Sequence, residues 1–176
     1  MITVHTLGPA GTNCEKAAHL WLKNNGHRGE VKLHQTLEDA AKYMNDTDGA
    51  DILLGCIVYP QLHHLVFKNL SHLKLIDCFV MDTHNMVFAG KGQKPGEIRT
   101  VGSHPAPQDL IRQVPGINTQ LSIRLFNSNS EAARQCAANA VDACISTDIS
   151  ANRCGLTVLA DFGPVPMGFS IHAKIA

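Results

Sequence analysis

Apolar and polar residues follow two different periods along this chain. Segments with the two-residue period of a strand alternate with segments that have the period of a helix. Segment 2–7 alternates with the period of a strand, and the apolar residues of segment 17–22 then recur at helical spacing. Similar changes predict further strands over 31–35, 51–58, 73–80, 85–89, 98–101, 121–126, 143–146, 156–159 and 167–175. Helices are expected after the strands ending at 35, 101, 126 and 146. This alternation predicts an α/β protein with largely parallel sheets.

The first strand runs into a loop and a capped helix. The loop contains Gly8 and Gly11, and Thr12 with Glu15 has the Thr-x-x-Glu spacing of a capping box, which makes Thr12 the expected N-cap. Gly26 is expected to end this helix. A helix N-terminus reached through such a loop can hold a carboxylate or a phosphate. The alternative is an ordinary strand-to-helix turn whose glycines serve only the backbone.

Two further helix starts are polar. Residues Ser128, Asn129 and Ser130 precede Glu131, which repeats the capping-box spacing and offers hydroxyl groups to an anion. At the other start, Ser103 and His104 are followed by prolines at 105 and 107, which have no N–H group. Any contribution there must come from the two side chains. The alternatives are a plain N-cap for Ser103 and a surface loop position for His104.

Composition and charge narrow the class of protein. The chain has 176 residues, is 44% apolar and carries 15 basic and 15 acidic side chains, so its formal net charge is zero. This balance argues against nucleic acid or an anionic membrane surface as the main partner. No apolar run approaches the ~20 residues of a membrane span, and no signal segment opens the chain. We therefore expect a soluble, cytoplasmic protein.

Cysteine and histidine usage points away from disulfides and metal. The six cysteines are scattered without a C-x-x-C pair, and several lie in apolar contexts, which favours buried free thiols in a reducing compartment. Among ten histidines, only His63 and His64 are adjacent, and no i, i+4 pair supports a ligand set. We expect no bound metal.

Three motifs together carry a family resemblance. Segments 7–12 (Leu-Gly-Pro-Ala-Gly-Thr), 103–105 (Ser-His-Pro) and 127–133 (Asn-Ser-Asn-Ser-Glu-Ala-Ala) follow the order and rough spacing of the prephenate dehydratase domain, and 142–159 resembles its closing segment. The resemblance implies a two-lobed fold like a type II periplasmic binding protein, with the ligand held between the lobes. It implies lobe 1 over 1–80, with a returning strand at 166–176, and lobe 2 over 81–165. It leaves no room for the regulatory ACT domain that usually follows.

The departures from this family are informative. Dehydratases carry Thr-Arg-Phe near the end of the catalytic domain, where the threonine assists loss of the ring hydroxyl; here Met167 and Gly168 precede Phe169. The family's Glu-Asn-Ser is also missing after Pro60. A thioether cannot donate a proton and a glycine cannot pair with a carboxylate. In this the chain resembles the prephenate decarboxylases of bacilysin-type antibiotic biosynthesis, which remove the ring carboxylate, move a double bond and retain the hydroxyl.

The resemblance therefore implies a cofactor-free prephenate decarboxylase. Thr12 and Asn13, with Ser128, Asn129 and Ser130, are expected to hold the two carboxylates of prephenate, while Ser103, Met167, Gly168 and Phe169 complete the binding set. His104 is the expected proton donor to the ring carbon, partly protonated near an anion. The alternatives are a dehydratase without an ACT domain, which would make phenylpyruvate, and a non-catalytic small-molecule binding module. Oligomeric state cannot be read from the sequence, and a homodimer stays open.

Overall fold

The structure is a computed structural model that describes residues 1–47 and 49–175. The chain forms two compact units, Met1–Asp82 with Pro166–Ala176 (lobe 1) and Thr83–Val165 (lobe 2). Lobe 1 extends two residues past position 80 because its fourth strand continues to Asp82. Ala176, the last residue of the expected returning strand, lies outside the described residues.

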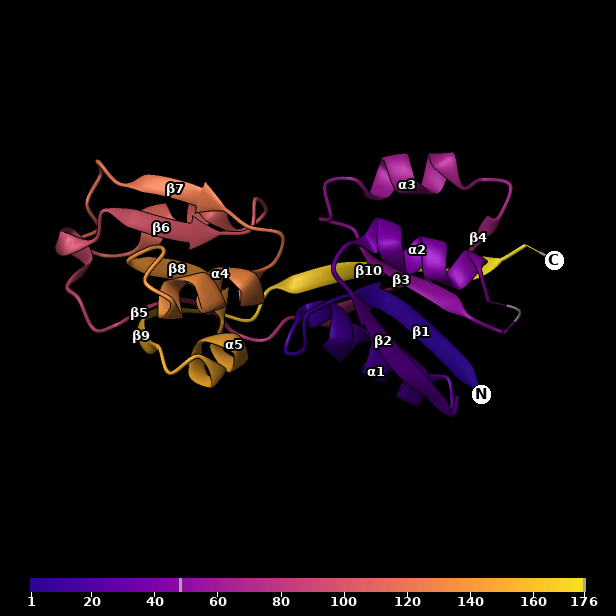
Figure 1. Cartoon of the computed structure of the whole chain (residues 1–176). Helices are drawn as coiled ribbons and strands as arrows, with labels where there is room; N and C mark the ends of the chain where they lie inside the picture. Colours follow the sequence, from indigo (N-terminus) through magenta and orange to yellow (C-terminus); the bar gives the residue numbers. More distant parts are fainter. Residues whose placement is uncertain (48, 176) are drawn as a thin grey trace. The chain divides into compact units, whose positions relative to one another are not determined.

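Lobe 1 is built on a five-stranded sheet with the order β2-β1-β3-β10-β4. Its elements are β1 (Ile2–Leu7), α1 (Asn13–Asn24), β2 (Gly29–His34), α2 (Leu37–Asn45), β3 (Ile52–Cys56), α3 (Leu62–Lys68), β4 (Leu73–Asp82) and β10 (Pro166–Lys174). Strand β1 is parallel to β2 and β3, whereas β10 is antiparallel to β3 and β4. Figure 1 shows α1 on one side of this sheet, and α2 and α3 on the other.

Alternation along β3 explains why both faces of this sheet are covered. Ile52 and Leu54 pack into the cluster around α1, while Leu53 packs into the cluster formed with α2 and α3. Successive side chains of a strand point to opposite faces, so an unbroken apolar run needs a helix on each side. The apolar stripe predicted for α1 is buried in the first cluster.

Lobe 2 is built on a second five-stranded sheet, with the order β7-β6-β8-β5-β9. Its elements are β5 (Met86–Gly90), η1 (Pro95–Glu97), β6 (Thr100–Ser103), η2 (Gln108–Gln113), β7 (Ser122–Leu125), α4 (Asn129–Ala137), β8 (Ala143–Thr147), α5 (Asp148–Arg153) and β9 (Thr157–Gly163). Strand β6 is parallel to β7 and β8, and β5 is antiparallel to β8 and β9. Helices α4 and α5 cover one face, with Val87 and Ala89 of β5 beneath them (Figure 1).

The two-lobed α/β fold is confirmed, but the expectation of largely parallel sheets is wrong. Each sheet is mixed, because β10 lies antiparallel between β3 and β4, and β5 lies antiparallel between β8 and β9. A local alternation of strands and helices cannot reveal this, since β10 joins its sheet only after the chain has built lobe 2.

Several element boundaries also differ from the sequence pattern. The strand expected over 51–58 ends at Cys56, and α3 forms in a stretch for which the pattern predicted no helix. The strand expected over 98–101 is shifted to Thr100–Ser103. The helix expected after it is a 3-10 helix whose N-cap is Pro107, because the two prolines delay its start.

Candidate active site

The start of α1 is held by the predicted cap. Thr12 is the N-cap, and its Oγ1 accepts a hydrogen bond from the Glu15 N–H at 3.3 Å and donates one to the Leu7 carbonyl, also at 3.3 Å. The reciprocal bond of the capping box is shifted by one residue. The Glu15 carboxylate accepts from the N–H of Gly11, at 2.6 Å, and not from the N–H of the N-cap Thr12. Thr12 is 8% exposed. Its hydroxyl is thus committed to the backbone, and its influence on an anion runs through the position of the helix start.

The start of α4 in lobe 2 is capped in the same way. Ser128 Oγ accepts from the Glu131 N–H at 3.0 Å. The Glu131 side chain bonds Arg134 and Gln135 and so does not complete the box at the cap. The predicted N-cap is therefore confirmed, and the reciprocal half of the capping box is wrong.

A hydroxyl network joins the start of α4 to the start of α5. Ser130 Oγ lies 2.7 Å from Ser150 Oγ, which Thr147 also reaches at 3.0 Å, and Ser146 Oγ donates to the Asn129 carbonyl at 2.9 Å. The Asn129 Oδ1 atom is buried without a hydrogen-bond partner in the part of the chain that the structure describes. Residues 146–150 were missed as neighbours of this helix start. The Thr147-x-x-Ser150 spacing at a strand end could have indicated a cap.

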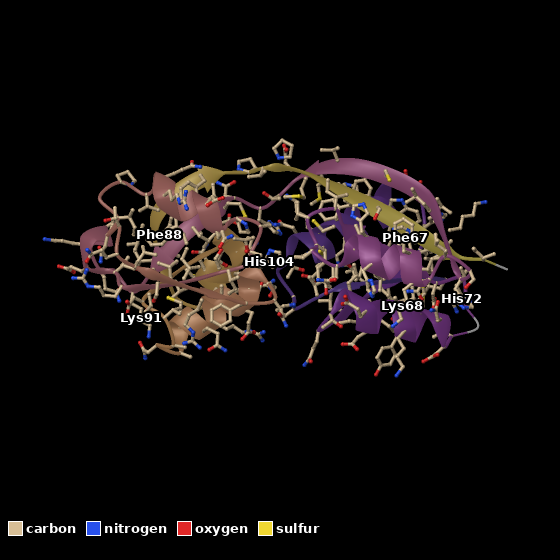
Figure 2. The ribbon with its side chains drawn as sticks, turned by 90° about the horizontal axis from the view of Figure 1, so that it is seen from above. Phe67, Lys68, His72, Phe88, Lys91 and His104 are labelled. Atoms are coloured by element: carbon tan, nitrogen blue, oxygen red, sulfur yellow. The ribbon has the colours of Figure 1, made fainter. Side chains whose placement is uncertain are left out.

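Ser103 and His104 do not lie at a helix start, which corrects that expectation. Ser103 ends β6 and is fully buried, and its hydroxyl donates to the His104 carbonyl at 2.8 Å. His104 Nδ1 accepts from the Ala106 N–H at 3.2 Å, so Nδ1 carries no proton in this arrangement. Burial lowers the pKa of His104. With Nδ1 as an acceptor, the neutral form of His104, which is labelled in Figure 2, carries its proton on Nε2.

The segment that differs from dehydratases lies at the start of β10. Met167 and Phe169 both pack into the core cluster beside α1, and the Phe169 ring, 1% exposed, stacks on Phe79 with centroids 5.6 Å apart. Since alternate residues of a strand point to opposite faces, Gly168 faces the side of α2 and α3. Phe169 is thus a core residue of lobe 1. Its expected contact with a substrate ring stays a prediction.

Ile57 covers the open face of Gly168. The Ile57 N–H donates to the Gly168 carbonyl at 3.1 Å, and a Cβ added at Gly168 would lie 2.6 Å from Ile57 Cδ1. The sequence pattern predicted a strand over 51–58, which includes Ile57, but the strand ends at Cys56 and Ile57 is 59% exposed. The contact joins residues 111 positions apart, so no local pattern could have revealed it.

Lobe 1 also holds a titratable cluster that none of the motifs includes. The His5 Nδ1 and His34 Nε2 atoms lie 2.9 Å apart, and His5 Nε2 lies 3.4 Å from Asp51 Oδ2. Burial lowers the pKa of His5 and of His34. Burial would raise the pKa of Asp51, but hydrogen bonds, first among them the one from Thr47, lower it.

The structure also bears on the cysteines, the adjacent histidines and the expectations of no metal and no membrane span. All six cysteines are free. His63 and His64 lie in α3. Within residues 1–47 and 49–175, no group of three or more His, Cys, Asp and Glu side chains could hold a metal ion. None of the described helices combines the length and the apolar character needed to cross a membrane.

Comparison with known proteins gives a consistent family. The family model described as prephenate dehydratase matches residues 4–162. A curated relative, the prephenate decarboxylase of Bacillus subtilis (strain 168), is 26% identical over 186 aligned residues, which cover 99% of this chain and 87% of that protein.

Two solved structures show the same fold. The prephenate dehydratase from Arthrobacter aurescens, in complex with L-Phe, has a TM-score of 0.76 at 14% identity. The match covers 100% of this chain but 61% of that one, so this chain spans less than two thirds of its length. The periplasmic VFT2 domain of Bordetella pertussis BvgS has a TM-score of 0.57 at 15% identity, covering 98% of this chain and 80% of that one.

Proposed function

Because the chain belongs to the prephenate dehydratase family, we propose that it is a carboxy-lyase that decarboxylates prephenate without making the ring aromatic. The observation that carries this proposal is the likeness to curated prephenate decarboxylases over 99% of the chain. Met167 and Gly168, which stand where dehydratases have threonine and arginine, support it. Neither side chain can protonate a hydroxyl group.

In the proposed reaction, the atom that receives one proton decides the product. The bond between the ring and its carboxylate breaks, carbon dioxide leaves, and the electron pair forms a new ring double bond. The π electrons of the neighbouring double bond form the bond to one proton at a ring carbon, so the ring keeps two double bonds and the C–O bond stays intact. The product is a dihydro-4-hydroxyphenylpyruvate. The electron pair has a ring diene to enter, so we propose that no cofactor is needed.

We assign the two substrate carboxylates to the two capped helix starts. The start of α1, with Thr12 and Asn13, and the start of α4, with residues 128–130, each bring partial positive charge to a capped terminus. The caps fix each terminus but use their own hydroxyl groups to do so. Recognition of the carboxylates therefore relies on backbone groups and on the helix dipole.

We assign the proton transfer to His104, positioned by its neighbours. The Ala106 N–H on Nδ1 leaves Nε2 as the atom that faces away from the loop backbone, and the Ser103 hydroxyl holds the His104 carbonyl. As an acid, His104 must first gain a proton, which burial opposes and the two substrate carboxylates favour. Such acid catalysis typically contributes roughly 100- to 10,000-fold in rate.

The setting of the reaction is part of the proposal. Six free cysteines support a reducing compartment, and we propose a cytoplasmic enzyme of a natural-product pathway, such as antibiotic biosynthesis of the bacilysin type. The zero net charge supports a small dicarboxylate as its partner in preference to nucleic acid or a membrane surface. A homodimer is compatible with this assignment.

Incubation with prephenate tests the function. The expected product retains the hydroxyl and lacks the strong enol absorbance that phenylpyruvate shows in base. Carbon dioxide is released on both routes, so the identity of the organic product is the readout. Phenylpyruvate from the unmodified protein would make it a dehydratase, and unchanged prephenate with saturable binding would make it a binding module.

A further inference from the structure

An apolar side chain is held in the open at the end of β3. Ile57 follows the last residue of that strand, which is parallel to β1, and its side chain is 59% exposed. Ligands of α/β proteins bind at the carboxyl ends of parallel strands. The backbone N–H of Ile57 donates a hydrogen bond to the Gly168 carbonyl at 3.1 Å. The position of Ile57 is therefore set by β10 and is not that of a free loop.

Ile57 explains why position 168 is a glycine. Gly168 is not among the glycines with a positive φ, so its backbone conformation does not call for glycine. The demand is for space, because an added Cβ would lie 2.6 Å from Ile57 Cδ1 and 3.2 Å from Ile57 Cγ1. The Ile57 side chain thus fills the volume into which a side chain at position 168 would project.

We propose that Ile57 is a specificity-determining residue of the decarboxylation, an inference that rests on the proposed function. Ile57 and Gly168 together form an apolar wall that withholds water and acidic groups from the ring hydroxyl of prephenate. Each route from prephenate consumes one proton and releases carbon dioxide. When the proton goes to a ring carbon, the hydroxyl stays; when it goes to the hydroxyl oxygen, water leaves and the ring becomes aromatic.

Two substitutions test this wall. Ile57→Ala opens the volume beside Gly168 to water, and Ile57→Ser places a hydroxyl there. Both variants keep the backbone hydrogen bond to Gly168. We expect each to raise the ratio of phenylpyruvate to dihydro product by about tenfold or more, the scale of discrimination that one side-chain contact provides. Products are quantified at alkaline pH after subtraction of an enzyme-free blank.

Phe67→Ala is the matched control. Phe67 lies on α3 in the same lobe (Figure 2) and is 68% exposed, so the substitution removes a comparable exposed apolar group. We expect it to leave the product ratio unchanged. A merely structural effect would lower activity or the melting temperature without moving this ratio. Ile57→Val, which removes only Cδ1, serves if the larger truncation does not fold.

A second experiment probes the contact from the other side. Gly168→Ala should displace Ile57 and move the product ratio, and Gly168→Ala combined with Ile57→Val should restore it, because the atom at 2.6 Å is gone. A wild-type protein that makes the dihydro product, with Ile57→Ala and Ile57→Ser at the same ratio, would overturn the inference alone. A wild-type protein that makes phenylpyruvate or nothing would overturn the proposed function and this inference with it.

Discussion

The cap of α1 allows stability and substrate binding to be separated. Thr12→Val keeps the shape of the side chain and removes a hydroxyl that makes two backbone hydrogen bonds at 3.3 Å each. Loss of an N-cap costs about 1 kcal/mol. The Leu7 carbonyl loses a buried donor, which costs about 1 kcal/mol more. We expect the melting temperature to fall by about 4–8 °C, since a domain of this size loses about 2–4 °C per kcal/mol.

Thr36→Val is the matched control for this substitution. Thr36 caps α2 in the same lobe, and its Oγ1 accepts from the Asp39 N–H at 3.0 Å. Its hydroxyl donates only to the exposed Asp39 carboxylate, at 2.8 Å, which water can replace. The expected loss is therefore about 1 kcal/mol, the value of a cap alone. Thr36 is not part of the proposed site, so its substitution should leave KM unchanged.

The two variants should differ in KM for prephenate. If the start of α1 holds a carboxylate, a frayed terminus in Thr12→Val weakens an interaction of about 0.3–1 kcal/mol, which raises KM about two- to fivefold. Thr12→Ser, which keeps the hydroxyl, should retain most of the affinity. Assays are run well below both melting temperatures. Equal KM values for Thr12→Val and Thr36→Val would refute the assignment of this helix start to the substrate.

Three further predictions concern the reaction and the fold. Met167→Thr combined with Gly168→Arg should divert part of the flux to phenylpyruvate; lower activity with an unchanged product ratio would argue against the role of this pair. In the wild type, kcat/KM should fall about tenfold per pH unit above pH ~6.5, because burial lowers the pKa of His104, and His104→Gln should abolish this slope without forming phenylpyruvate. The free energy of unfolding, measured with urea, should decrease from pH 7.5 to pH 5.5, because the lowered pKa values of His5 and His34 mean that the unfolded chain binds more protons below about pH 6.5. His5→Phe should reduce that dependence, and a pH-independent stability would contradict it.

Features set by neighbours in the chain could be predicted from the sequence. The caps Thr12, Thr36 and Ser128 each bond an N–H group three residues ahead, so the spacing of residue types contains the whole interaction. Gly26 follows α1 with a φ of 64°, as its position past the helix end requires. In these cases the residues that form the recognisable sequence motif are the same residues that make the hydrogen bond or the turn.

Features that join distant segments could not be predicted. The contact of Ile57 with Gly168 and the bond between Ser130 and Ser150 depend on which strands become neighbours. The sequence pattern predicted a strand over 167–175, but not that it pairs antiparallel with β3 after the chain has returned from lobe 2. The periodicity of apolar residues shows which face of a helix or strand is buried. It does not show which other element packs on that face.

In the proposed reaction, the two carboxylates of prephenate are recognised by groups other than those that determine which product forms. A dehydratase and a decarboxylase of this family must bind the same prephenate dianion, so capped helix starts such as those of α1 and α4 cannot decide between the two products. The choice depends on where one proton is delivered. In our assignment His104 supplies it to carbon, and any other donor that reached the hydroxyl oxygen would divert flux to phenylpyruvate. The apolar surface of Ile57 beside Gly168 is therefore as necessary to the proposed reaction as the acid itself.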